Sequence, residues 1–132
     1  MSEPQSLSLA LVRQLHLVLR ELDGLDDETV NRALPFAPAN TLFQLGTHIA
    51  GSARWWTITN TGGSDFHRNR AAEFTAVGTA AELRADLERL TAQIEVHLAA
   101  LDPDALEEPL TNSNASMSHW PADRAMTQRD AI

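Results

Sequence analysis

The sequence predicts an all-α protein, an up-and-down four-helix bundle in which the fourth helix is truncated. Apolar residues recur at steps of three and four over residues 5–22, 41–60 and 80–101, which is the period of a helix that buries one face. Residues that favour helix starts and helix ends bracket these segments. A further helix start lies near Thr127, with no helix-length segment after it. We therefore expect one helical domain over residues 1–132 that lacks most of its C-terminal helix.

The first helix, over residues 5–22, has a clear apolar stripe, and Gly24 ends it. The stripe residues expected in the core are Leu11, Leu15 and Val18. His16 lies beside the stripe, where we expect a flanking histidine without a chemical role. Asp26 then opens a short helical turn that ends before Pro35, so this segment is expected to be a connector.

The second helix, over residues 41–60, is expected to start at Asn40, because an asparagine side-chain oxygen can accept from the free amides of a first turn. Gly62 and Gly63 end it. The apolar stripe runs through Leu42, Leu45, Ile49, Ala53 and Trp56, of which Leu45, Ile49 and Trp56 are expected in the core. A ridge of small residues beside the stripe would let a neighbouring backbone approach closely; it consists of Gly46, Ala50 and Ala53.

His48 lies at the edge of this stripe, on a row with Leu45, Ser52 and Trp55. An imidazole that faces a helix interface needs a partner, which is a hydrogen bond, a carboxylate or a metal. Helix geometry leaves open whether His48 is a satisfied, half-buried histidine or a ligand. Ser52 shares its face, but no nucleophile elbow or oxyanion motif accompanies the pair, which disfavours a hydrolase.

The third helix, over residues 80–101, has the clearest signals in the chain. Thr79 and Glu82 form a capping box at its start. The seam residues expected in the core are Leu83, Leu87, Leu90 and Ile94. His97 occupies the next seam position, where a polar group either fixes the register or binds a metal, and the sequence leaves its role open.

Two loops carry further polar residues. The first, residues 64–74, has no clear period and either lies exposed or binds a ligand carboxylate. The residues in it that could do so are His67, Arg68 and Arg70. The second, residues 107–123, is either a lid or pocket wall or a loose segment. The sequence leaves open the roles of this loop and of His119, which precedes Trp120 within it.

Composition excludes several classes of function. The 18 acidic and 10 basic residues give a net charge of -8, which argues against binding to nucleic acid. The absence of cysteine excludes disulfides, thiolate nucleophiles and cysteine metal sites, so a metal would have to be held by histidine and carboxylate. No apolar run has the length of a membrane span and no leader opens the chain, so we expect a cytoplasmic protein without membrane contact.

The predicted bundle has one uncovered side. Thr127 and Asp130 form a helix-start signature, and Ala131 and Ile132 begin an apolar stripe. Three amphipathic helices and this stub leave an apolar groove, which is poorly tolerated in water. Either a second copy covers it, which gives the homodimer that we expect, or the sequence is cut short.

The segment from Asn40 to Phe74 resembles the DinB-like superfamily of bacterial four-helix bundles. The resemblance is carried by THIAGSARWW, by the Gly62 and Gly63 pair and by the RNRAAEF run. The capped third helix and the polar loop before a last helix also suit that layout. The superfamily includes thiol-dependent S-transferases and maleylpyruvate isomerases that use mycothiol or bacillithiol.

The resemblance implies a divalent metal held by three histidines, one from the second helix and two spaced HxxxH on the fourth. His48 in LGTHIAG matches the first of these. No HxxxH pair exists in this sequence, and the resemblance places the missing pair just beyond Ile132. The metal site is therefore expected to be incomplete in this chain, with His48 as its one identified ligand.

Two functions remain from this reasoning. The first, implied by the resemblance, is a thiol S-transferase or isomerase that acts on a small molecule, with Zn, Ni or Fe and a low-molecular-weight thiol as co-substrate. The alternative is a non-catalytic helical module that binds another copy of itself or another protein. The sequence identifies neither the substrate nor the thiol, and whether the chain is an enzyme stays open.

Overall fold

The structure is a computed structural model that describes residues 1–36, 38–110 and 125–132. These residues form helices and no β-strand, and none of the helices has the length and apolar character needed to span a bilayer. In chain order the elements are α1 (Glu3–Glu21), α2 (Asp27–Val30), α3 (Leu42–Ala53), the π-helical turn η1 (Arg54–Ile58), the 3-10 turn η2 (Thr59–Thr61), α4 (Arg70–Glu73), α5 (Ala80–Ala100), the 3-10 turn η3 (Pro103–Glu107) and α6 (Gln128–Ala131). The prediction of an all-α fold is confirmed.

The long helices begin where side chains satisfy the free amides of the first turn. Thr79 and Glu82 form the predicted capping box of α5. Ser2 and Gln5 form another one, so α1 starts earlier than the predicted residue 5. The short α6 begins after Thr127, whose amide and hydroxyl both donate to the Asp130 carboxylate, as its start signal predicted.

The expected N-cap of the second helix was wrong. Thr41 rather than Asn40 caps α3, because its hydroxyl accepts from the Gln44 amide at 3.1 Å while the Gln44 side chain accepts from the Thr41 amide at 3.0 Å. The helical path then continues through η1 and η2, and Gly62 ends it in the left-handed conformation at φ 82°. The predicted range 41–60 is therefore helical, although its hydrogen-bond pattern changes twice.

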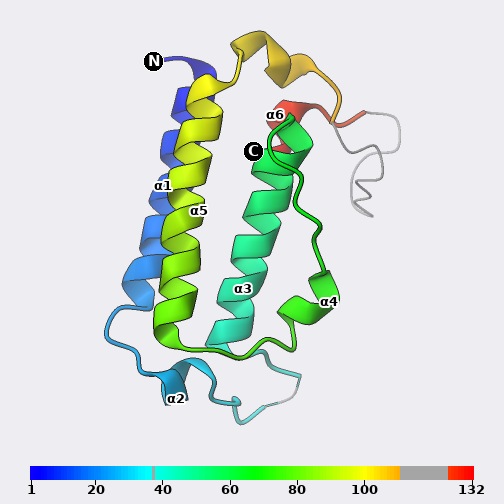
Figure 1. Cartoon of the computed structure of the whole chain (residues 1–132). Coiled ribbons are helices and arrows are strands. Elements are labelled where there is room, and N and C mark those ends of the chain that lie inside the picture. Colours follow the sequence, from blue (N-terminus) through cyan, green and yellow to red (C-terminus); the bar gives the residue numbers. More distant parts are fainter. Residues whose placement is uncertain (37, 111–124) are drawn as a thin grey trace.

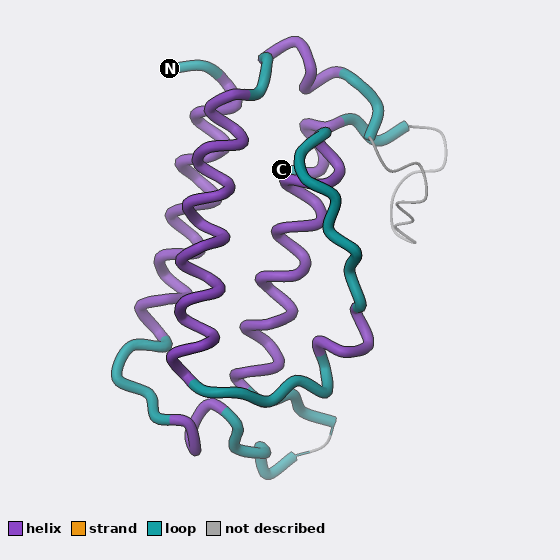
Figure 2. Tube along the Cα trace, viewed as in Figure 1, coloured by secondary structure: helices purple, strands orange, loops and turns teal. Residues whose placement is uncertain are grey.

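The three long helices lie side by side (Figure 1). α1 and α5 share the most extensive contact, and α3 packs against α5. α3 runs opposite to α1, and the chain after η2 returns along the bundle through an extended segment to α4, as Figure 2 shows. α5 consequently runs in the same direction as α3, and α6 lies near η2 at the end of the bundle.

Half of the ten predicted core residues are fully buried. Leu15 on α1 and four residues of α5 are at most 3% exposed; the four are Leu83, Leu87, Leu90 and Ile94. Three further predicted residues are partly buried against this core, namely Leu11, Val18 and Ile49.

The predicted orientation of α3 was wrong. Leu45 is 40% exposed, and Trp56 is half-buried rather than in the core. The small-residue ridge faces α5 instead, since a Cβ on Gly46 would lie 2.8 Å from Leu83 Cδ2. Close approach of α5 to this ridge turns the larger side chains of α3 towards the open side of the bundle.

The expected loop over residues 107–123 lies mostly outside the described residues. Residues 111–124 are not described, and they include His119 and Trp120. The predictions on this loop therefore stay predictions.

Candidate functional site

His48 on α3 has the carboxylate partner that its position at a helix interface demands. Its Nδ1 lies 2.7 Å from Oε2 of Glu73, the last residue of α4. The imidazole is 30% exposed, so one part of the ring meets the carboxylate while another part is accessible.

Glu73 is held in place by Arg68. Arg68 Nε donates to Glu73 Oε1 at 2.6 Å and Arg68 Nη2 donates to Oε2 at 3.0 Å. The two side chains are 13% and 7% exposed, respectively. Burial raises the pKa of the Glu73 carboxyl, but the hydrogen bonds from Arg68 and His48 outweigh it and lower the pKa below its ordinary value. The carboxylate is therefore charged at neutral pH.

This charge determines where the His48 proton lies. A carboxylate only accepts, so Nδ1 at 2.7 Å must donate to it. Arg68 Nη2 lies 3.3 Å from Nδ1, but both atoms are donors that share Oε2. In the neutral ring the lone pair is then on Nε2, which binds none of the described residues.

Local sequence brings Glu73 to this position. Asn69 caps α4 by accepting a backbone hydrogen bond at 3.1 Å, which orients the short helix. Gly51 on α3 leaves room for the carboxylate, because a Cβ there would lie 2.6 Å from Glu73 Oε1. The next residue is Phe74, and the centroid of its ring lies 4.9 Å from the centroid of the His48 ring. This contact limits rotation of the imidazole.

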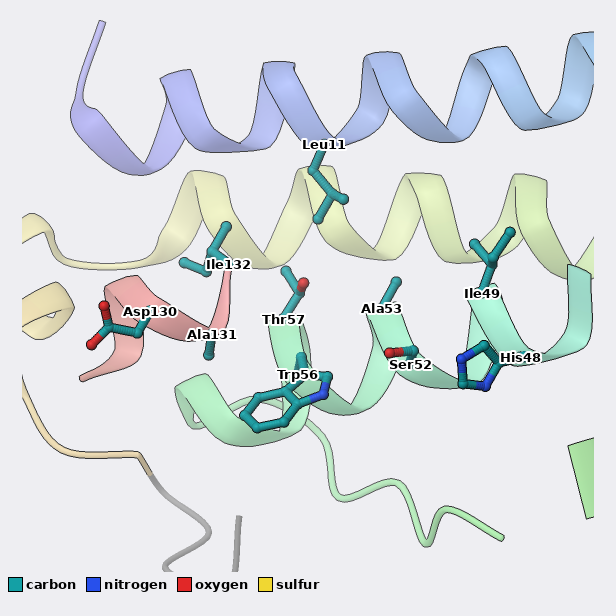
Figure 3. A pocket seen from close by; sticks show the side chains of 10 residues that line it. All are labelled: Leu11, His48, Ile49, Ser52, Ala53, Trp56, Thr57, Asp130, Ala131 and Ile132. Atoms are coloured by element: carbon teal, nitrogen blue, oxygen red, sulfur yellow. The ribbon is translucent and has the colours of Figure 1, made fainter. Parts of the chain in front are cut away.

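A groove of about 420 Å³ begins at His48 and is bordered by α1, α3, η1 and α6 (Figure 3). Its volume is in the range of small-molecule pockets. The polar residues that line it are His48, Ser52, Thr57 and Asp130. The apolar ones are Leu11, Ile49, Ala53, Trp56, Ala131 and Ile132. The structure thus brings His48 and Ser52 to one groove, and Asp130 lies at its opposite end from His48 (Figure 3).

The described residues do not form a complete metal site. Nowhere among them do three or more histidine or acidic side chains come together in a way that could hold a metal ion. His48 alone fits a ligand role, because a carboxylate on the other ring nitrogen is the usual support of a metal-binding histidine.

His97 lies apart from the groove of His48 and has a structural role. Thr61 Oγ1 lies 2.5 Å from the Thr57 carbonyl oxygen and 2.6 Å from His97 Nε2. Because the single hydroxyl proton goes to the carbonyl, Nε2 must be the donor to Thr61. Burial lowers the pKa of His97, which favours the neutral ring. The imidazole thus ties α5 to η2, and it does not line the groove of His48.

Sequence reasoning did not identify Glu73. It lies 25 residues after His48, in a segment without a helical period. The one signal was the acidic residue in RNRAAEF, close behind Arg68. In this loop His67 and Arg70 are exposed, whereas Arg68 turns inward and binds a carboxylate of the chain itself.

A sequence profile described as the DinB superfamily matches residues 10–131. No curated protein and no solved structure gives a significant match to the chain. The matched range contains His48, Arg68 and Glu73, together with all of α3, α4 and α5. Because the match extends over nearly the whole chain, and the helical bundle agrees with it, this chain belongs to the DinB superfamily.

Proposed function

We propose that the protein is a divalent-metal-dependent thiol S-transferase or isomerase in which His48 contributes one metal ligand. The observation that carries the proposal is the hydrogen bond from His48 Nδ1 to the buried Glu73 carboxylate at 2.7 Å. It supports a ligand role because it leaves the Nε2 lone pair for another partner. Membership of the DinB superfamily supports the same role, since the resemblance of LGTHIAG implies a histidine ligand at this position.

The other ligands are proposed to lie outside the described residues. Zn, Ni and Fe suit imidazole ligands, and such an ion, when bound, lowers the pKa of a thiol so that the thiolate is the nucleophile. The described residues around His48 would orient its imidazole for binding the metal. Glu73 keeps the proton of His48 on Nδ1, and Arg68 fixes Glu73. In this proposal a low-molecular-weight thiol is the co-substrate, and it reacts with a small electrophilic substrate.

Metal content of the full-length protein, purified without chelator, tests this function. We expect stoichiometric metal in the wild type and its loss in His48→Gln. His16→Gln is the matched control, because His16 is an exposed histidine on α1. Glu73→Gln should weaken metal affinity by about 10–100-fold while the protein still folds. Absence of metal from the wild type, or equal metal in His48→Gln, contradicts the proposal.

We also propose that the protein is a homodimer. Leu42 and Leu45 on α3 are 38% and 40% exposed, and a second copy would remove them from water. The alternative function, a non-catalytic helical module that binds another copy of itself or another protein, would use the same exposed face. Light scattering should give a dimer for the wild type and a monomer for Leu45→Glu. A monomeric wild type contradicts the dimer and, with it, a module that binds another copy of itself.

A further inference from the structure

We propose that a second groove, on the outer face of α5, binds a small organic carboxylate that carries a hydroxyl or N–H group at its other end. The groove has a volume of about 590 Å³, which suits a small molecule. The described residues that line it differ from those that line the groove of His48, so the proposal goes beyond the metal-dependent function and does not depend on it. An arginine at one end of the groove and a histidine at the other carry the proposal.

One face of α5 and the chain around η2 form the walls of the groove. Ile58 and Ser64 lie against α5, and Ile58 is 4% exposed. Thr59 Oγ1 donates to the Ser64 carbonyl oxygen at 2.9 Å and accepts from the Phe66 amide at 3.2 Å, which holds this wall in place. The α5 residues that share the face are Arg89, Ala92, Gln93, Val96, His97 and Ala100.

His97 provides a hydrogen-bond acceptor at one end of the groove. Its Nε2 donates to Thr61 Oγ1 at 2.6 Å, so the lone pair of the neutral ring is on Nδ1. Burial lowers the pKa of His97, which keeps the ring neutral at neutral pH. Nδ1 has no hydrogen-bond partner among the described residues. Because His97 lines the groove, a ligand hydroxyl or N–H there can donate to this nitrogen.

Arg89 gives the other end a positive charge. It lies about two turns before His97, or about 12 Å along the axis of α5. Arg89 Nη2 is 3.4 Å from Asp86 Oδ1, but the same oxygen accepts from Arg54 Nη2 at 3.0 Å. One carboxylate is therefore shared by two guanidinium groups, and these three side chains keep a net positive charge. No acidic residue is among the described residues of the lining, so a ligand carboxylate can pair with Arg89.

The lining between these ends is apolar or uncharged. Val96 is 72% exposed, so a ligand that covers it removes apolar surface from water. Apolar surface alone would suit a protein partner as well as a small molecule. The charge of Arg89 and the acceptor on His97 favour the small molecule, because an aromatic acid with a hydroxyl or N–H opposite its carboxylate matches both groups.

The test uses three probes that share one skeleton, titrated into the full-length protein at neutral pH. The probe 3-(4-hydroxyphenyl)propionate has both polar groups, 3-phenylpropionate lacks the hydroxyl, and 3-(4-hydroxyphenyl)propanamide lacks the charge. The backbone amide resonances of Ala92, Val96 and His97 should shift saturably with the first probe. Loss of the hydroxyl should weaken binding about two- to tenfold, and loss of the charge about two- to fivefold. Absence of saturable binding, or equal binding of all three probes, overturns the proposal.

Arg89→Gln tests the charged end. This variant should bind the hydroxylated acid and its amide equally, because the amide differs from the acid in the charge that Arg89 pairs. Arg13→Gln is the matched control, since Arg13 is an exposed arginine on α1 that does not line the groove. It should keep the preference for the acid. An unchanged preference in Arg89→Gln shows that the probes bind elsewhere and overturns the proposal.

The ring ¹⁵N resonances of His97 test the other end without a substitution. Nδ1 should shift with 3-(4-hydroxyphenyl)propionate more than with 3-phenylpropionate, while Nε2 keeps its proton. Equal Nδ1 shifts with the two acids overturn the proposal. A second copy of the chain on this face is the rival occupant. It would make the amide resonances of Ala92 and Val96 depend on protein concentration without any probe, and that result also overturns the proposal.

Discussion

Gly51→Ala tests the arrangement of His48 and Glu73 directly. A Cβ at position 51 would lie 2.6 Å from Glu73 Oε1 and 3.1 Å from its Cδ, so the carboxylate must move. The hydrogen bond from Arg68 Nε to Oε1, at 2.6 Å, is then broken. Loss of one hydrogen bond to a charged group costs about 1.5–3 kcal/mol, whereas alanine gains about 1 kcal/mol over glycine inside a helix. The variant should lose about 0.5–2 kcal/mol of unfolding free energy.

Urea denaturation measures this loss, and the Tm should fall by about 2–8 °C. The ring ¹⁵N resonances of His48 show whether its carboxylate partner has moved. Gly46→Ala is the matched control on the same helix, because its Cβ would meet Leu83 Cδ2 at 2.8 Å instead. Both variants should be destabilised, but the His48 nitrogens should shift in Gly51→Ala alone. The reasoning is refuted if Gly51→Ala matches the wild type in stability and in its His48 resonances.

Three further predictions concern pH and packing. The pKa of the Glu73 carboxyl lies below its ordinary value of 4.5, so the stability that the charged carboxylate contributes is present above pH 4.5 and is lost as the pH falls through the lowered pKa. Glu73→Gln should lose about 1.5–3 kcal/mol of unfolding free energy at neutral pH. Urea titrations should show that the difference in stability between wild type and Glu73→Gln disappears in acid. Burial lowers the pKa of His97 below 6.5, so protonation favours the unfolded chain, and the wild type should lose stability below pH 6.5 more steeply than His97→Gln in urea denaturation at a series of pH values. Leu87→Ala removes a side chain with 0% exposure and should cost about 2–5 kcal/mol, whereas thermal melting should show little change in Leu9→Ala, where the side chain is 61% exposed.

Helix positions were predictable because caps and apolar period are local signals. Thr79 with Glu82 located the start of α5, and its seam of leucines gave the buried face. The face of α3 was not predictable in the same way. Its sequence offers two rows, a large one through Leu45 and a small one through Gly46, and only the distance to Leu83 on α5 decides which row is buried.

The candidate site was half predictable. The position of His48 on a helix face required a partner, and that requirement follows from the polarity of imidazole. The identity of the partner depends on how a nonperiodic loop folds back onto α3. Arg68 and Glu73 satisfy each other and His48 in three dimensions, and no spacing in the sequence encodes that contact.

The π-helical turn η1 gives the chain one place where its length is adjustable. A π turn holds one residue more than an α-helix needs over the same path. Deletion of one residue within Arg54–Ile58 would restore regular α-helix and leave His48 before it and Thr61 after it facing their partners. The same deletion between Leu42 and His48 would rotate the imidazole by about 100° relative to the start of the helix and separate it from Glu73. Length variation among related chains should therefore concentrate at η1, and α3 before it should keep a constant length.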